Sequence, residues 1–133
     1  MELLKMSATK NTPEVILDPS TGTFEINGLS YPESTRDVYT PVMEWLDKYA
    51  KEIAGNIDNP ISFHFKLRYI NSSSFKYLLE IMKKMTDINE TGVPVEIIWH
   101  YEDIDDDIKD TGEHLFKSTS IKLPFKYIPY HED

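Results

Sequence analysis

One stretch of ten residues restricts the fold more than any other. In "ISFHFKLRYI", residues 61–70, apolar and polar side chains alternate. A period of two is typical of a β-strand with one side against a core and the other in water, whereas a strand buried on both sides would be apolar throughout. The chain therefore has to build a sheet with one wet face. The residues expected to face the core are Ile61, Phe63, Phe65, Leu67 and Tyr69.

A hairpin and a helix are expected before this strand. The stretch "EVILDPSTGTFEIN", residues 14–27, has two β-prone runs around a turn at 18–22 that contains Pro and Gly. Apolar residues at helical spacing follow. The helix that they predict begins either at Thr40 or earlier, near Ser34, and Gly55 is expected to end it.

Helices and strands continue to alternate after residue 70. The patterns predict a helix over 72–91, a strand over 93–101, a weaker, largely solvated helix within 102–116 and an edge strand within 123–130. The order ββαβαβαβ, together with strands that have one polar side, favours an α/β fold: a two-layer sandwich with the helices on one face of a mixed sheet. A chain of 133 residues is expected to form one domain, 1–133.

The charge balance narrows the choice of partners. Acidic residues outnumber basic ones by 23 to 14, which gives a net charge of −9. Such a surface repels phosphate backbones and anionic membranes, so we expect no nucleic-acid and no membrane partner, whereas a protein with a basic face suits it. No apolar run is long enough for a membrane span, and the N-terminus does not resemble a signal peptide, so a cytoplasmic location is expected.

The motifs of common enzymes are missing from the sequence. It contains no cysteine, no G-x-S-x-G elbow, no Walker A sequence and no dinucleotide-binding glycine pattern. With five glycines in all, loops that cradle phosphates are hard to build. We therefore expect a protein that is not an enzyme and that needs no cofactor.

Metal ligands are present, but not in the spacing of a known site. His64 and His100 fall on the polar sides of two predicted strands, where they can be neighbours. The run "DIDDDIKD" begins like a calcium-binding loop but has Ile108 where that loop needs Gly, and His114 where it needs Glu. No metal site is expected, and a small metal-dependent enzyme that uses the histidines and the acidic run is the alternative.

Three serines stand where the strand over 61–70 gives way to the next helix, in "YINSSSFKYLLEIM", residues 69–82. The first N–H groups of a helix lack partners within it and the positive end of its dipole lies there, so a phosphate at this point would be stabilised. Such a phosphate could change binding without unfolding the protein. The other interpretation is that Ser72 or Ser73 only caps the helix, which contributes about 1 kcal/mol.

Several tyrosines are candidates for contacts with a partner. Most aromatic residues fall at positions that face the core, and the pattern favours packing at the edge of the core for Tyr31, Tyr39 and Tyr101 as well. The alternative is that these three rings are partly exposed and anchor another protein.

Five stretches taken together resemble the SiaC family of bacterial regulatory phosphoproteins. The most specific pieces are G-x-S-Y-P-E, Tyr-x-Asn-[Ser/Thr]-Ser-Ser-x-Lys and W-x-Y-[DE]-x-x-D-x-D, and they occur in the family's order. The matching stretches are "TPEVILD" at 12–18, "GLSYPES" at 28–34, "YTPVMEWLDKY" at 39–49, "LRYINSSSFKYLLEIM" at 67–82 and "GVPVEIIWHYEDIDDDIKDTGEHL" at 92–115.

The resemblance implies a fold like that of STAS domains and anti-sigma-factor antagonists, and a role in partner switching. In this family a dedicated Ser/Thr protein kinase phosphorylates the hydroxyl that follows the Asn, and a PP2C-type phosphatase removes the phosphate. The unmodified form binds and activates a diguanylate cyclase, a GGDEF protein, which links the switch to cyclic-di-GMP and biofilm formation. A constitutive scaffold without modification is the plainer alternative.

Carried onto this sequence, the resemblance makes Ser72 the phosphoacceptor. The family usually has Thr at this position; since all three positions are Ser here, Ser73 is the fallback. The surroundings of the phosphate and the face for partners are then expected to include Tyr69, Asn71, Ser73, Ser74 and Lys76. Further contacts with partners are expected from Tyr31, Glu33 and Tyr101.

Overall fold

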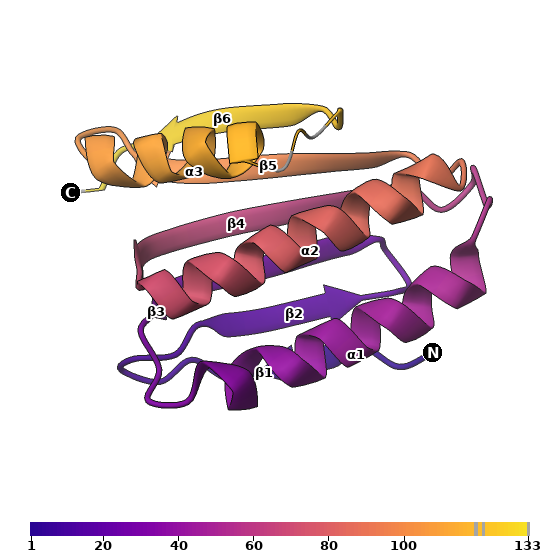
Figure 1. Ribbon diagram of the computed structural model, residues 1–133, viewed down its shortest axis with the longest axis horizontal. Helices are drawn as coiled ribbons and strands as arrows, with labels where there is room; N and C mark the ends of the chain where they lie inside the picture. The colour runs from indigo at the N-terminus through magenta and orange to yellow at the C-terminus, as the bar shows by residue number, and fades with distance from the viewer. Residues whose placement is uncertain (119, 121, 133) are drawn as a thin grey trace.

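Six strands form one mixed sheet in which they lie side by side in chain order (Figure 1). The structure is a computed structural model that describes residues 1–118, 120 and 122–132. The first three strands pair antiparallel, and the third to the sixth run parallel to one another. The strands are β1 (Leu4–Met6), β2 (Glu14–Asp18), β3 (Thr23–Ser30), β4 (Ile61–Ile70), β5 (Val95–Glu102) and β6 (Phe125–Tyr130).

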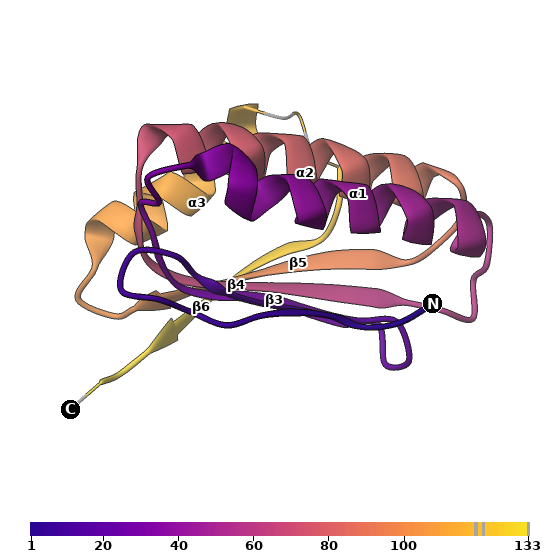
Figure 2. The same cartoon turned by 90° about the horizontal axis from the view of Figure 1, so that it is seen from below.

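Three helices, α1 (Thr35–Ile53), α2 (Ser72–Glu90) and α3 (Asp106–Ser118), cover one face of this sheet. Figure 2 shows them as one layer above the strands. The predicted fold class, an α/β two-layer sandwich with helices on a single face of a mixed sheet, is confirmed. The short edge strand β1 was not predicted, because three residues are too few to show a period. Within the described residues, no helix has both the length and the apolar composition of a membrane span.

The first helix begins at the earlier of the two predicted positions. Ser34 is its N-cap, and the Ser34 hydroxyl accepts a hydrogen bond of 3.4 Å from the N–H of Asp37. A start at Thr40 is therefore wrong. The earlier start brings Val38 and Tyr39 into the helix as buried residues, so its apolar face gains a further turn of contact with the sheet.

The third helix is more firmly packed than its sequence suggests. Ile108, Gly112 and Leu115 are buried, whereas Ile104, which was expected in the apolar stripe, lies before the helix and is 80% exposed. A Cβ atom on Gly112 would lie 2.5 Å from Nε1 of Trp99, so only glycine allows this approach. The same Nε1 donates a hydrogen bond of 2.9 Å to the carbonyl of Ile108, which fixes α3 over β5.

A β-bulge near the end of β4 reverses the direction of its last side chains. Gly28 pairs with Leu67, but the next residue of β3, Leu29, pairs with Tyr69, so Arg68 is an extra residue in β4. One inserted residue shifts the alternation by one step. The prediction that Tyr69 faces the core is therefore wrong: the residue is 52% exposed, and Ile70 packs against the core instead.

Candidate functional site

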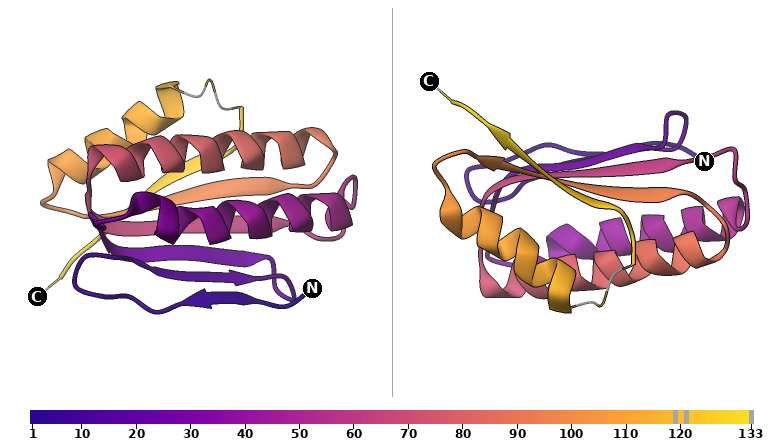
Figure 3. Two further views of the ribbon diagram at one scale, coloured as in Figure 1. Left: turned by 60° about the horizontal axis from the view of Figure 1, so that its bottom comes forward. Right: turned by 90° about the horizontal axis from the view of Figure 1, so that it is seen from above.

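The predicted switch region lies where the parallel strands end and the helices begin. Figure 3 shows α1, α2 and α3 all starting at this edge of the sheet. The N–H of Asn71 donates a hydrogen bond of 2.9 Å to the carbonyl of Ser30, so the start of α2 is joined to the last residue of β3. The motif that contains Ser30 and the motif that contains Asn71 are thus in direct contact.

Asn71 is the N-cap of α2. Its side-chain Oδ1 accepts a hydrogen bond of 2.9 Å from the N–H of Ser74, and its carbonyl accepts one of 3.0 Å from the N–H of Phe75. The interpretation in which Ser72 or Ser73 caps the helix is therefore wrong, because the residue before them has this role. Asn is among the strongest N-caps, and it leaves the two serine hydroxyls outside the capping bonds.

The three consecutive serines lie in two different environments. Ser72 and Ser73, the first two residues of α2, are exposed, whereas Ser74 is completely buried. Ser74 was expected in the surroundings of the phosphate and the face for partners, but its burial removes it from the accessible surface. The side chains of Ser72 and Ser73 are therefore accessible from outside the protein, and that of Ser74 is not.

Below the two exposed serines lies a chain of three buried hydroxyls. Oγ of Ser30 lies 2.7 Å from Oη of Tyr39 and 2.7 Å from Oγ of Ser74, and Ser74 donates a bond of 3.2 Å to the carbonyl of Ser30. We call Ser30, Tyr39 and Ser74 the hydroxyl chain. Burial raises the pKa of the Tyr39 phenol, so it stays protonated and able to donate.

Sequence analysis did not identify Ser30 and Tyr39 as parts of this region. Of the two interpretations of Tyr39, packing in the core is confirmed and the exposed anchor is wrong, because its ring is fully buried. A signal for Ser30 was present: it follows Phe24, Ile26 and Gly28 on the core side of β3, where a buried hydroxyl needs a polar partner.

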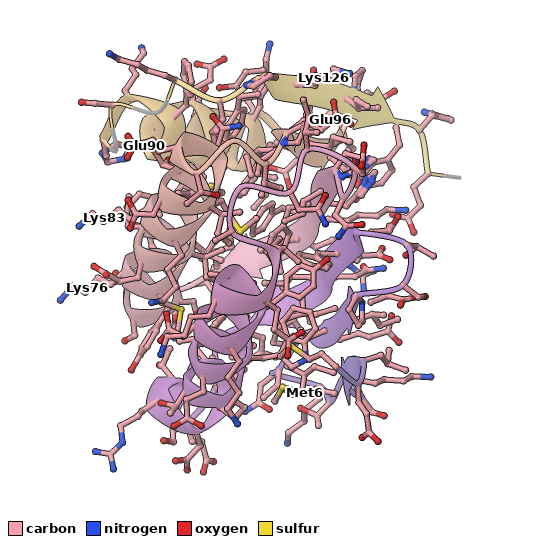
Figure 4. All side chains as sticks on the ribbon, turned by 90° about the vertical axis from the view of Figure 1, so that its right-hand side faces the viewer. Met6, Lys76, Lys83, Glu90, Glu96 and Lys126 are labelled. Atoms are coloured by element: carbon pink, nitrogen blue, oxygen red, sulfur yellow. The ribbon has the colours of Figure 1, made fainter. Side chains whose placement is uncertain are left out.

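The electrostatic surroundings of Ser72 suit an anion. The first turn of α2 holds no acidic residue, and Lys76 follows Ser72 by one helical turn on the same side. Figure 4 shows Lys76 and Lys83 directed away from the sheet. A negative group on Ser72 would therefore meet the positive end of the helix and the exposed side of α2 that carries the ammonium group of Lys76.

Two tyrosines form an exposed aromatic pair beside this region. The rings of Tyr31 and Tyr69 meet edge to face with their centroids 5.7 Å apart, and 42% of Tyr31 and 52% of Tyr69 are exposed. The Tyr31 hydroxyl donates a bond of 3.0 Å to the carbonyl of Lys10. Both tyrosines are close in sequence to residues that hold the start of α2: Tyr31 directly follows Ser30, and Tyr69 lies two residues before Asn71.

Two other residues expected to contact partners lie at the same edge of the sheet. Glu33 is exposed in the loop before α1. Tyr101 is half-buried near the end of β5, with the ammonium group of Lys109 5.8 Å from its ring centroid. The structure therefore leaves Glu33 fully, and Tyr101 partly, accessible to another protein.

The predicted neighbours His64 and His100 do meet on the open face of the sheet. Nδ1 of His64 lies 2.9 Å from Nε2 of His100, and the rings are stacked with centroids 5.2 Å apart. Burial, and then the charges of His64 and Lys66, lower the pKa of His100. In the part of the chain that is described, no cluster of three or more histidine and carboxylate side chains could hold a metal ion.

Comparison with known proteins agrees with the motifs. The model of the SiaC family of regulatory phosphoproteins matches residues 6–130. A protein of Pseudomonas aeruginosa strain UCBPP-PA14, described as "Uncharacterized protein PA14_02130", is 26% identical over 125 residues, which is 94% of each chain.

Solved structures with the same fold come from Pseudomonas aeruginosa. Apo-SiaC is 24% identical, with a TM-score of 0.84, and the match covers 96% of this chain and 99% of that one. A SiaC chain from a crystal of the diguanylate cyclase SiaD in complex with its activator SiaC has a TM-score of 0.86 at the same identity and coverage. At this identity, the likeness establishes a common fold.

Proposed function

Because the chain belongs to the SiaC family of regulatory phosphoproteins, we propose that it is a non-enzymatic switch protein that binds and activates a diguanylate cyclase in its unmodified form. A cognate Ser/Thr kinase phosphorylates Ser72, with Ser73 as the fallback, and a PP2C-type phosphatase reverses the reaction. The observation that carries the proposal is the exposed hydroxyl of Ser72 on the first residue of a helix that Asn71 already caps.

The folded protein can accept a phosphate at this point. A phosphate adds a charge of about −1.5 to −2, and a negative group near a helix N-terminus typically gains about 0.3–1 kcal/mol. Since Asn71 provides the cap, modification of Ser72 breaks no capping bond. The modification therefore changes the surface while the fold is retained.

A bound partner cannot accept the phosphate so easily. The exposed rings of Tyr31 and Tyr69 are suitable anchors for another protein, because aromatic side chains carry much of the binding energy of interfaces. A partner that covers them also covers the start of α2, and it would have to remove water from a dianion. Phosphorylation thus releases the cyclase by raising the cost of desolvation at the interface.

The experiment that tests this proposal compares charge variants in a cyclase-binding assay. We expect Ser72→Ala to bind the cognate cyclase like the unmodified protein, and Ser72→Asp to bind at least about tenfold more weakly, which corresponds to about 1.4 kcal/mol. The matched control is Ser118→Asp, which adds the same charge at an exposed serine at the end of α3. Equal affinity of Ser72→Asp and the unaltered protein would contradict the mechanism.

Mass spectrometry of protein isolated from its native cells tests the modification itself. The expected result is a phosphopeptide within residues 69–76 under at least one growth condition. A tandem mass spectrum of this peptide shows whether the phosphate is on Ser72 or on Ser73. Consistent absence of phosphate from this peptide would favour a constitutive scaffold.

A further inference from the structure

We infer that the hydroxyl chain of Ser30, Tyr39 and Ser74 is a positioning device for the switch, in that it holds the first turn of α2 and thereby fixes where Ser72 is presented. The inference rests on the function proposed for Ser72. None of the three hydroxyls meets a partner protein, since all three are buried. They act through the segment that they hold in place.

The donor in each hydrogen bond of the chain can be assigned by starting from the carbonyl of Ser30, which can only accept. Ser74 donates to the main-chain carbonyl of Ser30, and Ser30 donates to Oγ of Ser74. The hydroxyl proton of Ser30 is thereby used, so Oη of Tyr39 must be the donor in its contact with Ser30. Each hydroxyl donates once, and the chain joins α1, β3 and α2.

The carbonyl of Ser30 is the point at which the chain meets the cap of the helix. It accepts both the hydroxyl of Ser74 at 3.2 Å and the N–H of Asn71 at 2.9 Å. Asn71 in turn accepts the N–H of Ser74. The first turn of α2 is therefore tied to β3 by side-chain and main-chain bonds that share one acceptor.

The start of α2 has few other contacts that could hold it. Ser72 and Ser73 are exposed, and Phe75 is only half-buried, with its ring centroid 5.2 Å from that of His114. The first fully buried apolar residue of the helix is Leu78, almost two turns from its beginning. Helix ends without buried contacts open locally. Phe75 packs against the core but is only partly buried, so the hydroxyl chain supplies the one fully buried side-chain contact of this turn, through Ser74.

Hydrogen exchange measures this role directly. In Tyr39→Phe and Ser74→Ala, we expect the amides of residues 74–77 to exchange about three- to tenfold faster, the change that the loss of one hydrogen bond produces, and those of 85–88 to keep their rates. The control is Tyr77→Phe. The Tyr77 ring stacks on Tyr39 with centroids 5.3 Å apart, so this variant loses a phenol hydroxyl from the same aromatic stack but leaves the hydroxyl chain intact.

Phosphorylation by the cognate kinase with ATP is the second measurement. Because the kinase must meet Ser72 in one geometry, we expect kcat/KM for the protein substrate to fall about three- to tenfold in Tyr39→Phe and Ser74→Ala, and to stay unchanged in Tyr77→Phe. Unchanged kcat/KM in both chain variants would overturn the inference. So would exchange that rises equally in residues 74–77 and 85–88, because that result indicates general destabilisation.

The two measurements also separate this inference from the proposed function. Hydrogen exchange requires no kinase. It therefore tests in the isolated protein whether the hydroxyl chain holds the first turn of α2. Failure of the unaltered protein to be phosphorylated at residues 72–73 would reject the proposed function. In that case, hydrogen exchange still tests the hydroxyl chain. An unchanged rate at residues 74–77 in Ser74→Ala would reject the positioning role as well, and a raised rate would support it.

Discussion

At the start of α2 a single side chain, that of Asn71, determines which hydroxyls are free. Its Oδ1 accepts a hydrogen bond from the N–H of Ser74, so the hydroxyls of Ser72 and Ser73 are not needed to cap the helix. Had Ser72 been the cap, modification would have removed a bond that the helix needs. Because the capping residue is not the proposed phosphoacceptor, phosphorylation of Ser72 would change the surface charge while the helix keeps its N-cap.

This division of roles predicts different costs for two neighbouring substitutions. Asn71→Ala should lower the free energy of unfolding by about 1 kcal/mol, the usual value for a lost N-cap. Ser72→Ala should lower it by less than about 0.5 kcal/mol, as is usual for exposed sites. Urea denaturation measures both values. A larger loss for Ser72→Ala than for Asn71→Ala would restore the capping role to Ser72.

The pair of histidines on the open face predicts a dependence of stability on pH. The pKa of His100 is lowered from its ordinary value of 6.5 by burial and by His64 and Lys66, with Glu25 opposing. Between the lowered pKa and 6.5 the unfolded chain binds more protons than the folded one, so stability is full above pH 6.5 and falls as the pH falls.

Melting temperatures measured from pH 7.5 to 5 test this dependence. In the His100→Gln variant the decrease below about pH 6.5 should be smaller than in the unaltered protein. Equal slopes in the variant and the unaltered protein would show that His100 titrates alike in the folded and unfolded states.

Among the elements, α3 shows how a close contact can outweigh helix propensity. Gly112→Ala would gain up to about 1 kcal/mol of propensity, but the new Cβ would lie 2.5 Å from Nε1 of Trp99. Overpacking of a core typically costs about 1–3 kcal/mol, so we expect a net loss of about 1 kcal/mol. Urea denaturation should show this loss, while Asp110→Ala, on the exposed side of α3, should change stability by less than about 0.5 kcal/mol. A more stable Gly112→Ala would mean that α3 can move away from β5.

The elements themselves were largely predictable from the sequence. β4 spans the ten residues of the alternating stretch, and the alternation is a local pattern that the sequence shows directly. Gly55 follows the end of α1 with a φ of +75°, a left-handed conformation that glycine adopts readily, so this stop was predictable as well. The bulge at Arg68 was not predictable, because it depends on pairing with a strand 40 residues away. Tyr69 was therefore assigned to the wrong face.

The candidate site was predictable to a similar degree. The positions of Ser72 and Asn71 at a strand–helix junction follow from local pattern, and the expectation that Ser72 is the acceptor comes from the resemblance to a family. The hydroxyl chain was not predictable in this way, since Ser30 and Ser74 are 44 residues apart and meet only through the parallel pairing of β3 with β4. Ser74 was expected in the face for partners because it directly follows two other serines, and nothing local in the sequence distinguishes it from them.

For the whole molecule, contacts between distant segments favour unfolding as one unit, as expected for a single domain over residues 1–133. Nε1 of Trp45 in α1 donates a bond of 2.9 Å to the carbonyl of Glu2, which ties the N-terminal segment to the helical layer. Trp99 lies near the opposite edge of the sheet, under α3. The two indoles therefore report on opposite sides of the same core.

This arrangement predicts that the two sides lose structure together. Urea transitions followed by tryptophan fluorescence and by far-UV circular dichroism should coincide, because one core links all the elements. In Trp45→Phe only Trp99 emits, and its transition should still match the circular dichroism of the same variant. A fluorescence midpoint that differs from the dichroism midpoint would mean that the side with α3 and β6 unfolds separately. Ser72→Asp should retain the single transition of the unaltered protein, because a switch that acts only at an interface requires the fold to be the same in both of its states.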